Sequence, residues 1–128
     1  FFVKESSLIF SELSPRPHDT GMVTLLSQNM NEFELHLRAL LDLPIPEINL
    51  ISPAATRVIL SEDEYHKFAF YGIHEALKVQ NSKILIFGKP FAKKGRRMGV
   101  AIATGLDIEQ ARLRADQSAS KIKISSLD

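Results

Sequence analysis

The most concentrated charge in this sequence is a run of cations between two apolar segments. The nine residues from Lys89 to Arg97 contain five Lys or Arg side chains, and Pro90 and Gly95 shape the connection. The whole chain has 16 Lys and Arg against 15 Asp and Glu, so the chain outside this run is acidic. A local positive charge of this kind suits the binding of a small anion such as phosphate. A solvated hairpin loop and a short nucleic-acid contact are the alternatives.

A second polar cluster lies near the start of the chain. Glu12 stands at the end of an expected strand, and two prolines separated by one residue stiffen the loop that follows it. That loop carries an arginine, a histidine and an aspartate, namely Arg16, His18 and Asp19. The carboxylate of Glu12 offers the hard oxygen that Mg²⁺ prefers, but no second carboxylate stands close to it in the sequence. The alternative is a solvated surface loop.

The composition excludes several classes of protein. With 128 residues, 45% of them hydrophobic, the chain is long enough to bury a core. It has no Cys, which excludes a disulfide scaffold, a zinc finger and thiol catalysis. Its apolar runs are far shorter than the ~20 residues of a membrane span, and no signal peptide is visible, so we expect a cytoplasmic protein without a membrane partner. Because the sequence opens with Phe1 inside an apolar segment, we also expect a fragment of a longer protein.

Short strands and two capped helices must position the two polar clusters. Both longer helices open with the capping-box spacing, in which Asn31 precedes Glu34 and Asp107 precedes Gln110. Hydrophobic patterning predicts strands over 1–3, 8–13, 54–60, 84–87, 97–104 and 122–124. It predicts helical segments over 31–42, 72–79 and 107–120, and a short helical or irregular segment over 22–28.

The strands and helices are interleaved without a repeat, which predicts an α+β fold. Pro44 and Pro46 end the first long helix and mark the expected boundary between two domains, 1–44 and 45–128. The second long helix has a stripe of mostly small side chains that predicts close packing on a sheet. That stripe is Ile108, Ala111, Ala115 and Ala119.

Four segments of the chain resemble the C-terminal end of the formate-dependent phosphoribosylglycinamide formyltransferase family, which belongs to the ATP-grasp superfamily. They are Ser11–Leu25, Ala39–Pro46, Ser52–Leu60 and Phe87–Thr104. The resemblance runs in register along most of the chain and is weakest over 61–82. It covers well under half of the family's usual length. It implies the C-terminal end of an ATP-grasp domain followed by a small mixed α/β domain of the rudimentary hybrid type.

The resemblance also implies a reaction in purine biosynthesis. In the family, ATP activates formate as formyl phosphate, which the amine of glycinamide ribonucleotide then attacks. ATP and Mg²⁺ are the implied cofactors, and formate and glycinamide ribonucleotide are the other substrates. The full-length protein is expected to be a homodimer without a nucleic-acid partner. The chain alone is expected to be inactive, because the family's ATP-binding residues are absent from it.

The resemblance assigns five site residues by position. Glu12 matches a magnesium-binding glutamate of the family, whose other such glutamate would fall just before the first residue. Asp19 matches a residue that contacts the ribonucleotide, and its carboxylate suits accepting a hydrogen bond from the attacking amine, so it is the expected catalytic residue. Three cations match further ribonucleotide contacts, and the first and last of them are expected to grip the phosphate: Lys89, Arg96 and Arg97.

The related ATP-dependent carboxylase of aminoimidazole ribonucleotide is the first alternative. That family resembles the same loop but tends to have Asn where this chain has Asp19, so the sequence HDTG favours the formyltransferase. A small nucleic-acid-binding module that uses its basic loop is the second alternative. If the formyltransferase interpretation is right, Asp19 and Arg97 should share one cleft and contact opposite ends of one ligand.

Overall fold

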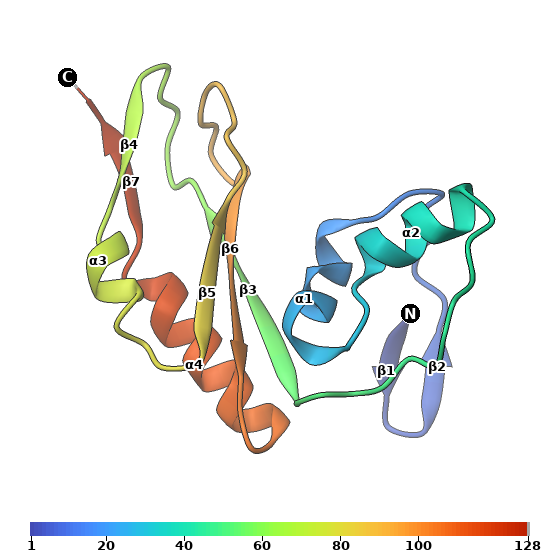
Figure 1. Ribbon diagram of the computed structural model, residues 1–128. Helices are drawn as coiled ribbons and strands as arrows, with labels where there is room; N and C mark the ends of the chain where they lie inside the picture. Colours follow the sequence, from blue (N-terminus) through green and yellow to red (C-terminus); the bar gives the residue numbers. More distant parts are fainter. Residues whose placement is uncertain (128) are drawn as a thin grey trace.

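The computed structural model describes residues 1–127 and shows two lobes joined by one extended segment (Figure 1). The first lobe holds β1 (Phe2–Lys4), β2 (Ser7–Ile9), the 3-10 helix η1 (Asp19–Val23), α1 (Thr24–Ser27) and α2 (Glu32–Leu40). The second lobe holds β3 (Ala54–Leu60), β4 (Phe68–Tyr71), α3 (Ile73–Ala76), β5 (Ser82–Ile86), β6 (Arg97–Thr104), α4 (Ile108–Ser120) and β7 (Lys123–Ser126). The mixture confirms the predicted α+β class. Within residues 1–127, no helix has both the length and the apolar character needed to cross a membrane.

The second lobe is built on an antiparallel sheet with the strand order β3-β6-β5. Helix α4 packs against β3 and β6, while α1 contacts the same two strands from the side of the first lobe (Figure 1). The central strand β6 is therefore buried from Met98 to Ala103. Strands covered on both faces are apolar throughout, which is the pattern of this segment. The strand holds Arg97 at its first position, beside the first lobe.

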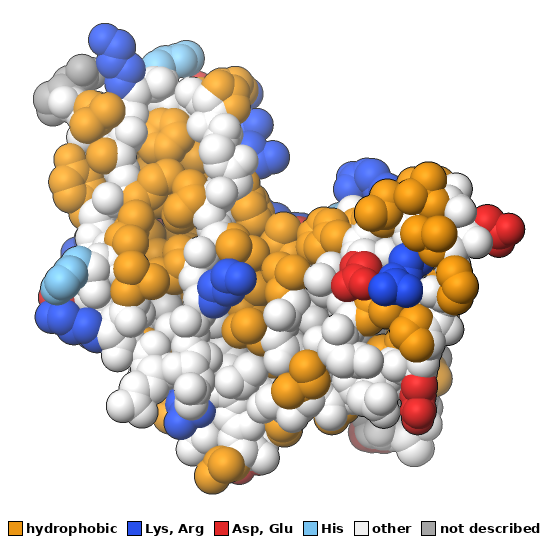
Figure 2. Space-filling model, in the orientation of Figure 1, with side chains coloured by type: hydrophobic (Ala, Val, Ile, Leu, Met, Phe, Trp, Pro, Cys, Tyr) orange, Lys and Arg blue, Asp and Glu red, His pale blue; other side chains and the backbone are white. Residues whose placement is uncertain are grey.

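A smaller sheet, β4–β7, stands beside the main sheet and leaves apolar surface uncovered. Phe70 and Ile124 pack against the core cluster around Ile122. Tyr71 and Ile86 nevertheless keep 50% and 39% of their surface exposed. Figure 2 shows apolar side chains gathered in the hollow between β4–β7 and the main sheet.

The two predicted helix starts are confirmed by their caps. Asn31 Oδ1 accepts hydrogen bonds of 3.1 Å from two amides in the first turn of α2, one of them that of Glu34. The Glu34 carboxylate does not return the bond, because it accepts from Arg38 one turn later. At the start of α4, Asp107 Oδ1 accepts a 2.8 Å bond from the amide of Gln110. Side-chain caps of this kind each stabilise a helix by about 1 kcal/mol.

The first lobe differs from the sequence prediction around the first polar cluster. Strand β2 ends at Ile9 because its pairing with β1 stops there, opposite Phe2. Glu12 consequently lies in an irregular, exposed segment and not at the end of a strand. The proline-stiffened loop that follows is short, since η1 already begins at Asp19.

The inner stripe of α4 also differs from the prediction at one position. Ile108 in the first turn is 51% exposed, whereas Ala111, Ala115 and Ala119 are buried as expected. A polar residue, Ser118, completes the buried stripe, and its hydroxyl lies 3.3 Å from the carbonyl oxygen of Ala76, to which it donates. Burial of a hydroxyl is tolerated here because the hydroxyl is hydrogen-bonded.

Gly99 lets β5 and β6 approach closely, two residues after Arg97. A Cβ atom at this position would lie 2.7 Å from the carbonyl oxygen of Leu85. We expect Gly99→Ala to lower the free energy of unfolding by about 1–3 kcal/mol, because backbone of the neighbouring strand cannot move aside cheaply. Urea denaturation measures this loss, and Ser120→Ala, on the exposed face of α4, is the control. An unchanged midpoint for Gly99→Ala would show that the strands can separate without cost.

Candidate functional site

The two polar clusters meet at one open pocket of about 480 Å³ between the lobes. Residues that lie 78 positions apart in sequence are in direct contact there. From the first cluster the pocket is lined by Arg16, Pro17, His18 and Asp19, and from the second by Lys89, Arg96 and Arg97. Met22, Phe33 and Phe87 form its apolar wall. We call this the interlobe pocket.

Asp19 and Arg97 form an ion pair in the interlobe pocket. Nη1 of Arg97 donates to both carboxylate oxygens of Asp19, at 2.8 Å to Oδ1 and 2.6 Å to Oδ2. The Asp19 side chain is only 18% exposed and that of Arg97 is 52% exposed. Both bonds come from the same nitrogen, Nη1. The other two nitrogens of the guanidinium, Nε and Nη2, have no partner within residues 1–127. The two residues share a cleft as predicted, but they touch each other and do not stand at opposite ends of it.

His18 supports the same carboxylate from the other side. Its Nδ1 lies 2.7 Å from Asp19 Oδ1, and a contact this short favours a proton on Nδ1, since two lone pairs would repel. The backbone amide of Thr20 is farther away, at 3.5 Å from the same nitrogen, in the position of a helix cap for η1. His18 is extended (φ −126°, ψ 158°) and the helical turn begins at the next residue, which brings the two side chains together.

The two adjacent arginines of the basic loop have different surroundings. The guanidinium of Arg96 stacks over the ring of Phe91, 4.4 Å from its centroid, and Nη1 donates a 3.0 Å bond to the Phe91 carbonyl oxygen. Arg96 therefore braces the loop by a cation–π contact, while Arg97 reaches across to the first lobe. Lys89 is exposed and has no partner among residues 1–127, so its ammonium group is available to an anion.

Glu12 does not line the interlobe pocket. Its side chain is exposed, and among the described residues no three His, Asp or Glu side chains are arranged to hold a metal ion. Mg²⁺ usually keeps several waters and binds through one or two carboxylates. Glu12 thus offers a donor of the right type, but residues 1–127 do not assemble a complete metal site around it.

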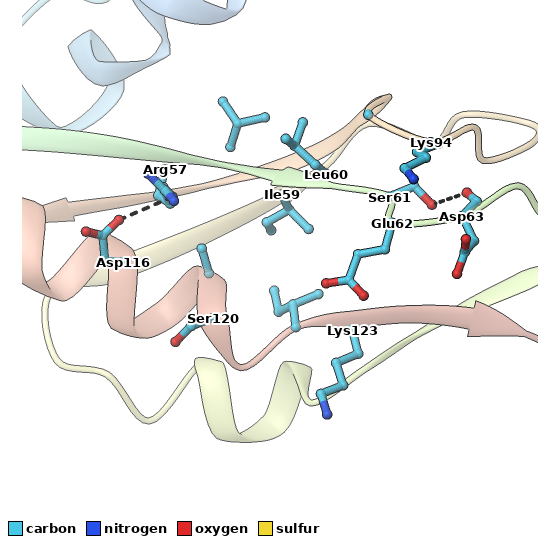
Figure 3. A pocket seen from close by; sticks show the side chains of 14 residues that line it. Arg57, Ile59, Leu60, Ser61, Glu62, Asp63, Lys94, Asp116, Ser120 and Lys123 are labelled. Atoms are coloured by element: carbon cyan, nitrogen blue, oxygen red, sulfur yellow. Dashed lines mark hydrogen bonds and ion pairs between the residues drawn. The ribbon is translucent and has the colours of Figure 1, made fainter.

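A larger pocket of about 1070 Å³ lies between β3, α4 and the segment after β3 (Figure 3). Arg57 and Asp116 form an ion pair at one end of it, with Nε and Oδ1 3.3 Å apart. Lys94, from the basic loop, points into this second pocket near Asp63. Its charged lining is balanced between acids and bases, and it contains none of the site residues predicted from sequence. We therefore place the candidate site in the interlobe pocket.

The apolar wall of the interlobe pocket was not foreseen from the sequence. Phe33, in the first turn of α2, is 40% exposed and faces the pocket. Met22 and Phe87 belong to η1 and to the segment after β5. No spacing rule relates three residues from three separate elements, so only the folded chain brings them together.

Comparisons with known proteins agree with this geometry. The family described as "PurT, C-terminal" matches residues 54–122, more than half of the chain. The chain belongs to the PurT family. A second family, described as "ATP-grasp domain", matches residues 1–33. The interlobe pocket of this PurT chain draws on both matched regions.

Several curated relatives of the PurT chain carry the same name. The chain is 67% identical over 126 residues to formate-dependent phosphoribosylglycinamide formyltransferase of Prochlorococcus marinus strain MIT 9312, covering 98% of this chain and 32% of the relative. It is 52% identical over 124 residues to the protein of the same name from Syntrophotalea carbinolica, covering 97% and 32%. The chain thus spans about a third of the length of the relatives it matches.

The fold of the PurT chain is similar to solved structures from two groups of enzymes. A structure titled glycinamide-RNase-transformylase T from Mycobacterium tuberculosis is 33% identical with a TM-score of 0.72, covering 94% of this chain and 30% of that one. N5-carboxyaminoimidazole ribonucleotide synthetase from Thermotoga maritima is 30% identical with a TM-score of 0.80, covering 88% and 32%. Backbone similarity therefore does not separate the two groups, whereas the sequence identities favour the first.

Proposed function

We propose that this chain supplies the ribonucleotide-binding part of a formate-dependent phosphoribosylglycinamide formyltransferase of purine biosynthesis. In the full-length protein, ATP would transfer its terminal phosphoryl group to formate, which gives formyl phosphate and ADP. The amine of glycinamide ribonucleotide would then attack the formyl carbon, releasing phosphate and one proton. The observation that carries the proposal is the interlobe pocket, in which Asp19 lies among cations, in a chain 67% identical to a relative of that name.

The cations of the pocket suit the phosphate of the ribonucleotide. Lys89 is free of protein partners within residues 1–127, and Nε and Nη2 of Arg97 point to no acceptor in that range. Arg guanidinium groups bind phosphate oxygens in pairs of hydrogen bonds, and a Lys adds a point charge. Arg96, which lines the same pocket, would fix the loop that presents both groups, because its own guanidinium is engaged by Phe91. Binding a remote phosphate positions the reacting amine.

Asp19 is the proposed catalytic residue. The Asp19 carboxylate is mostly buried and is held by Arg97 and His18, and its oxygens can accept a hydrogen bond from the amine of the substrate. Such a bond orients the nitrogen lone pair and can take up the proton that leaves as the amide bond forms.

ATP and Mg²⁺ would act in the first step, the activation of formate. When bound, Mg²⁺ spreads the charge that develops on the transferred phosphoryl group. Within this chain Glu12 is the residue proposed to hold it, together with groups outside residues 1–127. The domain boundary near residue 44, the cytoplasmic location, the homodimer and the absence of a nucleic-acid partner remain predictions of the same proposal.

A comparison of two anions tests the proposed function. The 0.80 TM-score to a carboxyaminoimidazole ribonucleotide synthetase makes an ATP-dependent carboxylase the second candidate. We expect formate to stimulate ADP release from ATP by the full-length protein at least about tenfold, with bicarbonate giving no stimulation, since activation of the one-carbon acid is the ATP-consuming step. A coupled assay for ADP measures this. Stimulation by bicarbonate instead would assign the carboxylase, and the isolated chain should release no ADP with either anion.

A further inference from the structure

We infer that Arg97 is a positioning residue for Asp19 as well as a ligand for the substrate's phosphate, so that anion binding and amine orientation are coupled through one side chain. The inference rests on the proposed function and concerns the same pocket. It assigns to Arg97 a contribution to the rate of formyl transfer that a cation serving only as a phosphate ligand would not make.

The geometry of the ion pair separates the two tasks. Nη1 of Arg97 makes both bonds to Asp19, at 2.6 and 2.8 Å, and leaves Nε and Nη2 without a partner in residues 1–127. A guanidinium carries five N–H donors in a rigid plane, so the same side chain can hold a carboxylate at one corner and a phosphate along its other edge. Lys89 has the same charge and lines the same pocket, but it makes no contact with Asp19.

The acceptor sites of Asp19 show why its orientation depends on Arg97. A carboxylate offers about four lone-pair sites. Oδ1 is approached by Arg97 at 2.8 Å and by His18 at 2.7 Å, while Oδ2 is approached only by Arg97 at 2.6 Å among the described residues. One site on Oδ2 therefore remains for the amine of a ligand. Without Arg97, His18 would hold Oδ1 alone and the plane of the carboxylate could rotate about that contact.

The position of Arg97 in the fold is consistent with this double task. It is the first residue of β6, and the next six residues of that strand are buried, so its backbone is fixed relative to the core. Asp19 begins η1 in the other lobe, after the proline-stiffened loop. The ion pair thus joins two rigid supports, and its 18% exposed carboxylate is largely screened from water, which strengthens the contact relative to a surface ion pair.

Steady-state kinetics of the full-length protein test the inference. We expect Arg97→Ala to lower kcat for formyl transfer by about 10- to 100-fold and also to raise KM for glycinamide ribonucleotide, because misplacing a reacting group by 1 Å can cost about 100-fold. Lys89→Ala should raise KM while kcat stays within about threefold. Arg97→Lys keeps one nitrogen for Asp19 but loses the second donor edge, so it should recover most of kcat and little of the affinity.

A double-mutant cycle gives an independent measurement. If Arg97 acts through Asp19, adding Arg97→Ala to Asp19→Asn should lower kcat by less than about twofold more, whereas the same change in the wild type lowers it at least tenfold. The inference is overturned if Arg97→Ala changes KM alone, as Lys89→Ala does, or if its effect on kcat is undiminished beside Asp19→Asn.

Two controls separate this outcome from other failures. A wild-type protein without formate-dependent formyl transfer would contradict the proposed function and not the coupling alone. Formate-dependent ADP release reports folding of each variant. If Arg97→Ala also lost ADP release, Arg97→Met would replace it, because Met keeps an unbranched side chain but has no donor for Asp19. A kcat for Arg97→Met equal to that of Lys89→Ala would overturn the inference.

Discussion

Asp19→Asn is expected to lower formyl transfer by the full-length protein by about 10²- to 10⁴-fold, the range of a positioned general base. Formate-dependent ADP release should stay within about threefold of the wild type. The amide has the size of the carboxylate, but it cannot take up a proton and it turns an NH₂ group toward either Arg97 or the amine. Parallel assays of formylated ribonucleotide and of ADP measure the two activities.

Asp116→Asn is the matched control for this substitution. Asp116 is also paired with an arginine, Arg57 at 3.3 Å, but it lies on α4 at the second pocket. It should leave both activities within about twofold of the wild type, as exposed ion pairs contribute little to stability. Equal losses of formyl transfer and ADP release in Asp19→Asn would contradict an Asp19 that faces the amine.

Removing the two cations that are proposed to bind the phosphate is expected to have the second largest effect. The double variant Lys89→Ala/Arg97→Ala should raise KM for glycinamide ribonucleotide by about 10²- to 10⁴-fold, because each charge-assisted hydrogen bond to a phosphate contributes about 1.5–3 kcal/mol and 1.4 kcal/mol is tenfold in affinity. KM for ATP should change by less than about threefold. Initial rates at varied ribonucleotide and fixed ATP provide the measurement.

The same loop offers a control that removes an equal charge. Lys93 lies over the Phe91 ring, 5.4 Å from its centroid, and Lys94 points into the second pocket (Figure 3). Neither lines the interlobe pocket, so Lys93→Ala/Lys94→Ala should leave KM for the ribonucleotide within about threefold. A rise equal to that of the first double variant would mean that the loop acts through its overall potential, as in a nucleic-acid contact, whose affinity falls steeply with salt.

The parts of the fold that depend on neighbouring residues could be predicted from the sequence. Asn31 and Asp107 begin helices because a side-chain oxygen three residues before an amide caps it locally. Strands β3 and β6 were placed at 54–60 and 97–104, which are their observed bounds, because apolar patterning extends over each whole strand. These features require no knowledge of what lies elsewhere in the chain.

The features that depend on distant residues could not be predicted in the same way. The hydrophobic pattern of α4 does not show that the first turn of the helix is exposed to solvent. Ile108 was therefore assigned to the buried stripe, whereas Ser118 was not. Strand β4 was not among the predicted strands, because its pairing with β7 joins residues more than fifty positions apart. The 3-10 turn that starts at Asp19 was also missed, since the residue before it is His18 and not a typical capping residue.

The candidate site was found by a combination of both kinds of inference. Spacing alone marked two polar clusters, each with a plain surface loop as its alternative. Resemblance to a family named the residues within them, and the structure then brought Asp19, Lys89, Arg96 and Arg97 to one pocket. The direct contact between Asp19 and Arg97 was visible in neither the spacing nor the resemblance. Glu12 stays a prediction, because it lies outside the pocket.

A crystal structure of the full-length protein with glycinamide ribonucleotide is the most direct test of the interlobe pocket as the substrate site. We expect the ligand's phosphate within about 2.7–3.2 Å of Lys89 Nζ and of Nε or Nη2 of Arg97, and the amine at a similar distance from Asp19 Oδ2. A ribonucleotide bound in the second pocket, or one whose phosphate lies beyond hydrogen-bonding distance of both cations, would contradict the account.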